Sequence, residues 1–512
     1  MNTKLPSREP GQRGLVLPIV LVMGVIILLI ASATFWSLKQ QRRQTGQGRK
    51  DFQSVHAAEA GIKYFQNRLN GISFCQSWLG HDDSLAVQNL LHDFTVALPT
   101  PYGKTRGFMI RNASVIPGIR PFAIHFESVG GVILPNGSLD TTNGWPIICD
   151  VYMRTSAEFV FYMQQADELI GEGVHLKGRV FARSIWPLAN AVFEDLVSTV
   201  FGIVYFTDVD SSTITFMKGT ENVSANPYTL DNIRITWSGP PEACGGGLKY
   251  SYNDLAMGMV PGDRRGFTYN GRQDKILVDL DEVTQSGGSV ALNLYEFDSM
   301  AVDGKGRLAL RASLPRSQFN GVLFINGDAF IRGTLRGTSL TVVASDDIFA
   351  VHNILCSGTE TGGDTPVTLG LIAQGKFYMW RYCPTRLTLN AVIIAKDDYP
   401  PELGLPHQGG PYDLMYSWWA LGPAALHSGV DANGNPASNL DPANWTFTLQ
   451  GGIISRNAGG FRMDGSNGWP EGKYRTYTFN QNNVFNPPPY FPMLSAALPG
   501  VPRWGVKGWE EK

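Results

Sequence analysis

The stretch GVLFINGDAFIRGTLRGTSLTVVASDDIFAVHNIL, residues 321–355, decides the fold. Within it, apolar residues stand mostly at alternate positions in short runs, and turn pairs such as Asn326-Gly327 and Ser345-Asp346 separate the runs. Alternation places every second side chain on one face of a strand. Strands this short bury that face most easily as stacked rungs, so the stretch predicts a β-solenoid. A Greek-key sandwich of ordinary short strands is the alternative.

Similar short runs recur along the chain, each with glycine near its ends. They are GVHLKGRVFARSI (173–185), VTLGLIAQGKFYM (367–379), LTLNAVIIAKD (387–397) and WTFTLQGGIISR (445–456). Their spacing is irregular, which indicates a quasi-repeat and not a strict period. We therefore expect a small β-rich domain at 71–166, a β-solenoid-like domain at 167–400, and a loop-rich extension with further rungs and a Pro/aromatic tail at 401–512.

Composition excludes some functions. The formal net charge of −2 gives no electrostatic basis for binding nucleic acid, whose phosphates require clustered Lys and Arg. The five cysteines show no C-x-x-C spacing, which argues against a zinc site, and we expect no cofactor. Cys356 and Cys383 each end a strand-like run, so they form the candidate disulfide of an exported body.

The N-terminal region has a different pattern. Residues 15–35 carry no charge, and 21 such residues make a helix of about 31 Å, the thickness of a bilayer core. The run is too long for the apolar region of a cleavable signal. Beyond it, Phe52, Val55, Ala58, Ile62, Phe65 and Leu69 form an apolar stripe at helical spacing. We expect one transmembrane and amphipathic helix over 15–70, leading directly into the folded body.

This layout resembles the type IV prepilin and pseudopilin families. Lys4, Arg8 and Arg13 precede Gly14, and DFQSVHAAEAGIKYFQNRL, residues 51–69, is similar to the conserved segment of the PilX-like minor pilins. The resemblance implies a leader at 1–14 that prepilin peptidase removes between Gly14 and Leu15. Ile19 stands where most pilins carry Glu, a departure that the resemblance associates with minor or tip subunits. An ordinary uncleaved signal-anchor is the alternative.

The later β-runs and PPPYFP, residues 487–492, come in the order of an uncharacterised bacterial β-rich family that often follows PilX-like N-termini. That second resemblance implies a fold and no activity.

Signals for catalysis or metal binding are few. The chain lacks a G-x-S-x-G elbow, a P-loop and an H-E-x-x-H helix. Asp346-Asp347 and Asp397-Asp398 are adjacent pairs, whose side chains would point to opposite faces of a strand, and Asp346-Asp347 fits solvated turn carboxylates. A weak calcium candidate places oxygen ligands at Asp431, Asn433 and Asn435, although Pro436 replaces the glycine that such a loop needs. Trp418 and Trp419 are candidate binding aromatics for a sugar or a protein.

The sequence thus predicts a mainly β fold with a long N-terminal α-helix, a single pilin-like transmembrane helix, and a β-solenoid. The expected function is structural and not enzymatic: a low-copy or tip-located minor pilin or pseudopilin-like subunit. Its expected partners are other pilin subunits, prepilin peptidase and the bacterial inner membrane, with the C-terminal body in the periplasm or on the cell surface. The alternative is an anchored β-helix protein that binds or cleaves cell-envelope polysaccharide.

Overall fold

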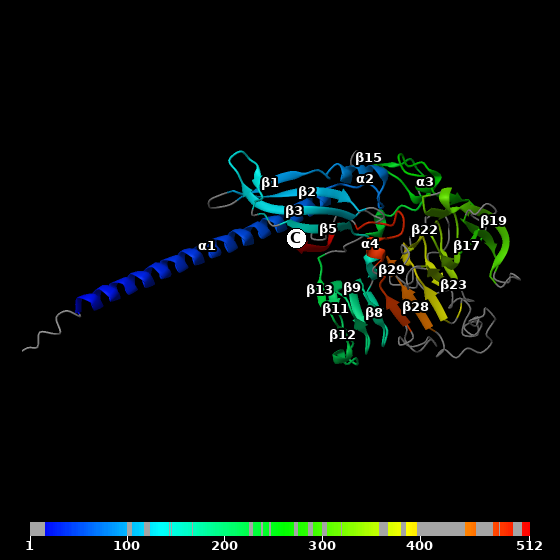
Figure 1. The fold of residues 1–512 in the computed structure, drawn as a ribbon. Coiled ribbons are helices and arrows are strands. Elements are labelled where there is room, and N and C mark those ends of the chain that lie inside the picture. The colour runs from blue at the N-terminus through cyan, green and yellow to red at the C-terminus, as the bar shows by residue number, and fades with distance from the viewer. Residues whose placement is uncertain are drawn as a thin grey trace, which may run out of the picture.

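The computed structural model (Figure 1) describes most of the chain from residue 16 onward. The described residues are 16–99, 105–116, 123–142, 144, 146–165, 167–224, 229–236, 239–244, 247–270, 275–284, 290–298, 305–318, 320–357, 367–379, 384, 386–396, 446–456, 475–480, 482–494 and 504–511.

A long helix packs on an antiparallel sheet (Figure 1). Helix α1 spans Val16–Asn70, and the short α2 spans His81–Gln88. The sheet has the order β1-β2-β3-β5-β31, with β4 beside β3, and all its pairings are antiparallel. Its strands are β1 Phe94–Leu98, β2 Arg106–Val115, β3 Ala123–Ile133, β4 Leu139–Asp140, β5 Pro146–Met153 and β31 Trp504–Glu511. We call this sheet, together with residues 53–91 that pack on it, the head.

The predicted transmembrane character of the N-terminal helix is wrong. In the part of the chain that the structure describes, no helix is both long and apolar enough to cross a membrane. Helix α1 continues beyond Phe35 into a polar stretch with Lys39, Arg42, Arg43, Arg49 and Lys50. Charges at this density are costly in hydrocarbon. The expected fold class is corrected in this respect, and so is the expected localisation as a single-pass inner-membrane protein.

Strand β31 follows all other described elements, yet it pairs with β5. Everything between β5 and β31 is therefore an insertion into the head sheet. This insertion is a solenoid of two facing sheets, which we call the β22 sheet and the β23 sheet. Neighbouring strands in both are parallel, except for the antiparallel meander β17-β18-β19 at one end of the β23 sheet.

The β22 sheet has the order β13-β11-β9-β6-β29-β27-β24-β22-β20-β16, with β7 beside β9. Its strands are β6 Phe159–Met163, β7 Asp167–Ile170, β9 Arg179–Pro187, β11 Val197–Ile203, β13 Thr220–Asn222, β16 Phe267–Tyr269, β20 Val322–Ile325, β22 Leu340–Ala344, β24 Leu369–Ala373, β27 Val392–Ala395 and β29 Gly452–Ser455.

The β23 sheet has the order β12-β10-β8-β30-β28-β26-β23-β21-β17-β18-β19, with β25 beside β23. Its strands are β8 His175–Lys177, β10 Val192–Phe193, β12 Thr215–Phe216, β17 Ile276–Thr284, β18 Val290–Phe297, β19 Arg307–Pro315, β21 Ala329–Leu335, β23 Ile348–Cys356, β25 Phe377–Met379, β26 Arg386–Leu389, β28 Thr446–Gln450 and β30 Arg475–Thr478.

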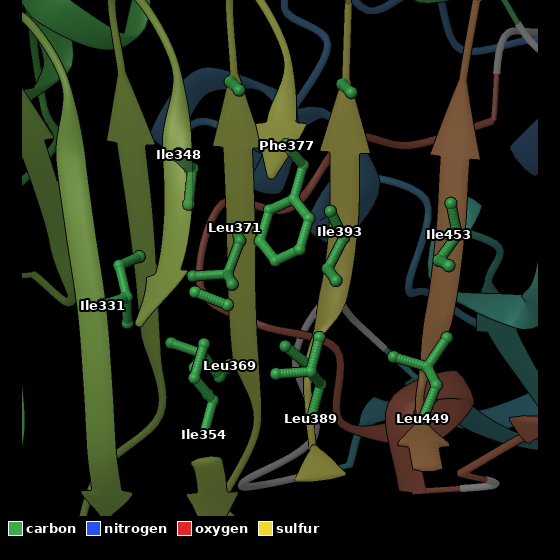
Figure 2. Packing of buried hydrophobic residues seen from close by; sticks show 14 of the residues in the cluster. Ile331, Ile348, Ile354, Leu369, Leu371, Phe377, Leu389, Ile393, Leu449 and Ile453 are labelled. Carbon is green, nitrogen blue, oxygen red and sulfur yellow. The ribbon is translucent and has the colours of Figure 1, made fainter. Parts of the chain in front are cut away.

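The alternation seen in the sequence produces the core between these sheets. Figure 2 shows side chains from both sheets meeting between them, rung above rung. The labelled residues are Ile331, Ile348, Ile354, Leu369, Leu371, Phe377, Leu389, Ile393, Leu449 and Ile453, and all are buried. Each rung buries its apolar face only because the next rung covers it, which is the general logic of stacked repeats.

The order of the rungs in space differs from their order in the sequence. From β6 the chain runs through β8 to β13 toward one end of the solenoid, and it resumes with β16 at the opposite end. It then returns rung by rung, until β29 pairs with β6 and β30 pairs with β8. The N–H of Phe479 donates to the carbonyl of Lys177 at 2.6 Å. Two separate stretches of the chain thus form one continuous ladder of strands. We call the rung of β6 and β30 the junction.

The segment that carries the chain between the two ends covers the outer face of the β22 sheet. This crossover segment, residues 229–266, includes the hairpin β14 Glu242–Cys244 and β15 Gly247–Lys249 and the helix α3 Tyr252–Met257. Its buried side chains pack against outward-facing residues of the sheet in a cluster that includes Ile233, Leu255, Phe324, Ile372 and Ile394. Runs such as VIIA in β27 are apolar without interruption because both of their faces are buried.

The chain enters and leaves the solenoid through a two-stranded neck, residues 154–156 and 492–494. Thr155 and Met493 form an antiparallel bridge, and the N–H of Leu494 donates to the carbonyl of Arg154 at 3.1 Å. Beside the neck, the buried carboxylate of Glu158 pairs with Arg154 and Arg179. The short helix α4, Asn482–Phe485, precedes the outgoing strand of the neck.

Replacing Gly452 tests how tightly the two stretches of the chain pack against each other at the junction. A Cβ on Gly452 would lie 2.0 Å from the carbonyl oxygen of Phe159, which belongs to the β6 backbone. That backbone cannot retreat without loosening the β6–β29 pairing, so we expect Gly452→Ala to lower the free energy of unfolding by about 1–3 kcal/mol. Urea denaturation measures the change. Gly171→Ala is the control, because its Cβ would find its nearest neighbour at 3.5 Å. Equal effects at the two sites would contradict a tight junction.

Candidate assembly interface

Small residues allow α1 to lie directly on the head sheet. A Cβ on Gly130 of β3 would lie 1.9 Å from the carbonyl oxygen of Ser54, and one on Gly61 of α1 would lie 2.2 Å from Oγ of Ser128. The hydroxyl of Ser128 donates to the carbonyl of Ala58 at 2.7 Å. The AAEAG segment, residues 57–61, is therefore the place where the helix contacts β3 most closely, because only small side chains permit this approach. We call this segment the seat.

Below the seat, larger side chains fill the head core. Phe65 and Leu69 of α1 are fully buried and pack in one cluster with residues of β2, β3 and β5. The rings of Phe65 and Phe126 have centroids 4.6 Å apart in a tilted arrangement, which is favourable for aromatic pairs. These contacts fix the last four turns of α1 to the sheet.

Strand β31 completes the head around the end of α1. The N–H of Trp504 donates to Oδ1 of Asn70 at 3.1 Å, and the side-chain amide of Gln66 donates to the carbonyl of Trp504. The Trp504 side chain is fully buried in the same cluster. A strand that lies more than 400 residues further along the chain thus orients the helix.

The preceding part of α1 projects away from the head (Figure 1). Residues 31–41 are exposed without exception, and so are the side chains of Met23 and Leu28. The exposed fractions of Leu28, Phe35 and Leu38 are 70%, 66% and 54%. Steps of seven and three residues place these three on one face of the helix. We call residues 23–41 the arm. A helix that exposes an apolar stripe while its other end is held rigidly has the geometry of a docking element.

Several predicted site residues lie outside the described part of the chain. They are Gly14, Leu15, Cys383, Trp418, Trp419, Asp431, Asn433 and Asn435. Ile19 lies in α1, with a side chain that is not described. Among the described residues, no group of three or more His, Cys, Asp or Glu could hold a metal ion.

Cys356 ends β23 and faces inward. Its thiol donates to the carbonyl of Asn390 at 3.2 Å, and burial raises the pKa of this thiol to about 12. Burial thus disfavours the thiolate, which is the nucleophilic form of cysteine. The pairing with Cys383 remains a prediction.

Turn carboxylates link successive rungs of the β23 sheet. Asp328 Oδ1 accepts the N–H of Asp347 at 3.1 Å, and Asp347 Oδ1 accepts the N–H of Lys376 at 2.7 Å. Each aspartate thus holds the turn of the next rung. Burial raises the pKa of Asp328, the nearby charge of Asp346 raises it further, and the hydrogen bond from Asp347 partly offsets both effects. This arrangement fits the structural role expected of turn carboxylates.

A second set of charges lies where the β17-β18-β19 meander meets β21. The buried carboxylate of Asp279 pairs with Arg307, and Arg332 lies 3.8 Å from Asp279 and 3.7 Å from Asp281. Arg332 also donates to the carbonyl of Lys305 at 3.1 Å. Paired in this way, the carboxylates fasten the meander to β21. Sequence reasoning missed this set because its members come from three separate segments.

The glycines of the head sheet were also missed. Gly130 and Gly131 stand side by side within β3, and Gly131 would clash with the carbonyl of Asp140 if it carried a Cβ. Paired glycines inside a strand mark a close backbone approach. That signal, read together with the AAEAG segment, could have located the seat.

Asp328→Asn tests the effect of the half-buried turn carboxylate on stability. Because the pKa of Asp328 is raised in the folded state, folding favours the protonated carboxyl group. The stability that this group contributes is therefore fully present below its unfolded-state pKa and is lost as the pH rises through its folded-state pKa. Asparagine keeps the acceptor for Asp347 and does not titrate. We therefore expect Asp328→Asn to raise Tm relative to the wild type at about pH 7, with the gain shrinking toward about pH 3.5. The exposed Glu172→Gln is the control. A gain that grows on acidification would contradict the burial of Asp328.

Comparisons with known proteins give little further guidance. No family model matches the chain, and no curated protein matches it. Among solved structures, it is similar to the competence-associated pilin ComZ from Thermus thermophilus, with 10% sequence identity and a TM-score of 0.26. The match covers 90% of this chain and 97% of that one. A TM-score at this level is a distant likeness and carries no argument about function.

Proposed function

We propose that this chain is a structural subunit of a type IV pilus or of a type II secretion-like pseudopilus, present in low copy or at the tip. The observation that carries the proposal is the division of α1 into a seated end and an exposed arm. Residues 54–69 are locked onto an antiparallel sheet, and residues 31–41 are exposed on every side. One rigid helix thus presents the apolar stripe of Leu28, Phe35 and Leu38 to other molecules.

The partners that fit this stripe are the arms of other pilin-type subunits. An exposed helical stripe of this kind is buried most simply by another helix with the same pattern, packed ridge into groove. Prepilin peptidase is the further proposed partner, acting between Gly14 and Leu15. An enzymatic role is not proposed, since the described carboxylates of the solenoid turns and of the β17-β18-β19 meander serve structural bonds.

The size of the solenoid favours a low-copy or tip position. The main path of the β22 sheet has ten strands, which at about 4.8 Å per strand gives a ladder about 43 Å long. The ladder is attached to the head, which is built around one small sheet and the end of α1 (Figure 1). If every subunit carried such a ladder, neighbouring bodies along a filament would compete for the same space.

A charge placed in the arm tests the proposed packing. Phe35→Asp puts a carboxylate into the apolar stripe, where desolvating it against a neighbouring helix is costly. We expect the variant to be lost from sheared fibres of the cells that make this chain, roughly tenfold or more relative to the wild type. Immunoblotting of the fibre fraction and immunogold electron microscopy measure the incorporation.

Gln40→Asp is the matched control for this experiment. It adds the same charge to the same exposed helix, away from the face of Leu28 and Phe35. It should incorporate like the wild type, and both variants should unfold at the wild-type urea midpoint. Equal incorporation of Phe35→Asp, or absence of the wild-type chain from fibres, would reject the proposal.

Processing of the leader is tested separately. Co-expression with a prepilin peptidase should shorten the wild-type chain by residues 1–14, and Gly14→Val should prevent this, because the peptidase that the resemblance implies cuts after glycine. Intact-protein mass spectrometry measures both masses. An unshortened wild-type chain would argue against the pilin assignment even if fibres were found.

A further inference from the structure

The segment that follows α1 contacts the crossover segment of the solenoid. The side-chain amide of Gln76 donates to the carbonyl of Leu248 at 2.7 Å, and its Oε1 accepts the N–H of Tyr250 at 3.0 Å. Two residues further on, the fully buried Trp78 packs on Tyr252, with ring centroids 4.5 Å apart. The head therefore holds the hairpin β14–β15 and the start of α3 in a defined position.

Two cysteines meet in this contact. The thiol of Cys75 lies 2.7 Å from the carbonyl oxygen of Cys244, and neither cysteine is in a disulfide. Given standard covalent geometry, this distance places the two Cα atoms at most about 8 Å apart, and a bent path shortens their separation toward the range of about 4.4–6.8 Å that a disulfide spans.

The surroundings favour reaction at these two cysteines over others. Cys75 and Cys244 are half-buried, and the ammonium group of Lys249 lies within electrostatic range of both. A half-buried thiol is accessible to a small oxidant, and the thiolate is the form that attacks a disulfide. Cys149 and Cys356 are buried, and burial raises the pKa of each thiol to about 12. The described cysteines thus divide into two half-buried cysteines that lie close together and two buried thiols.

We propose that Cys75 and Cys244 form a disulfide that fastens the crossover segment to the head. One thiolate attacks a low-molecular-weight disulfide such as oxidised glutathione, forming a mixed disulfide and releasing one glutathione thiolate. The second cysteine thiolate then attacks the protein sulfur of the mixed disulfide and releases the second glutathione. The protein loses two protons and two electrons, and the glutathione disulfide is reduced to two thiols. The proposal does not rest on the pilin assignment.

The bond would act at a point on which the solenoid depends. The crossover segment covers the outer face of the β22 sheet and connects the two stretches of chain that form the ladder. A covalent link between residues 169 positions apart restricts the opening of this cover. Oxidised protein should therefore expose the crossover segment to protease less often than reduced protein.

The test uses the purified full-length chain. It is reduced, equilibrated with a buffer of oxidised and reduced glutathione, and quenched with iodoacetamide; a non-reducing digest is then analysed by mass spectrometry. We expect a peptide pair linking Cys75 to Cys244, with Cys149 left as a thiol. Cleavage of the crossover segment by a protease should be roughly tenfold slower after oxidation, and dithiothreitol should reverse this.

Variants separate the proposal from its alternatives. Cys356→Ser should leave the 75–244 link intact, whereas Cys75→Ser or Cys244→Ser should abolish it and remove the redox effect on proteolysis. The pairing measured on the wild-type chain requires no variant to fold. A link from Cys75 to Cys383, links only between molecules, or full alkylation of both cysteines after oxidation would each overturn the proposal.

Discussion

The backbone pairing of β6 between β29 and β9 is the constraint on which the rest of the structure depends. An ordinary solenoid begins at one end and finishes at the other, so its termini would lie about 43 Å apart for the ten strands of the β22 sheet. The head sheet cannot accept such an insertion, because β5 and β31 are adjacent strands. Starting at the junction, running to one end and returning from the other places the first and last rungs side by side.

The two-stranded neck and the crossover segment follow from this arrangement. With β6 and β30 in one rung, the incoming and outgoing chains are close enough to pair at Thr155 and Met493. The arrangement requires one long connection between the two ends of the ladder, and the crossover segment serves as that connection. It also buries the outward-facing apolar residues of the β22 sheet, which would otherwise face water. One stretch of chain thus satisfies a topological need and a hydrophobic one.

The sequence predicted the local parts of this fold better than their order. Alternating residues between Gly321 and Leu355 indicated short stacked strands, because alternation and turn pairs are local signals. The permuted order of the rungs could not be predicted, since parallel rungs with similar apolar inner faces can stack in many different orders. Nothing in the polar and aromatic residues of β31 marks them as partners of β5. The membrane-spanning prediction followed from 21 uncharged residues alone, and it was wrong.

For the candidate interface, the sequence contained the components without their geometry. The AAEAG segment was recognised by resemblance, and its physical reason became apparent only when Gly130 and Ser128 were found opposite it. The helix and the strand that form the seat are separated by about 70 residues, and a single sequence does not reveal such pairs. The same holds for Cys75 and Cys244, which lie 169 positions apart. Their positions at the ends of strand-like runs drew attention to Cys356 and Cys383 instead, and that pairing remains a prediction.

The structure separates the two tasks that the proposed function assigns to this chain. The head and arm expose a helix that the proposal assigns to packing, and their rigidity comes from the seat, the aromatic core and the late strand β31. The solenoid is held to the head by the neck, by the buried pairing of Glu158 with Arg154, and by the packing of Trp78 on Tyr252. Because these attachments lie at the sheet and not along the exposed arm, the bulk of the solenoid leaves the arm uncovered. A large body and an exposed helix therefore coexist in one chain, which is what the proposed assembly through the helix would require.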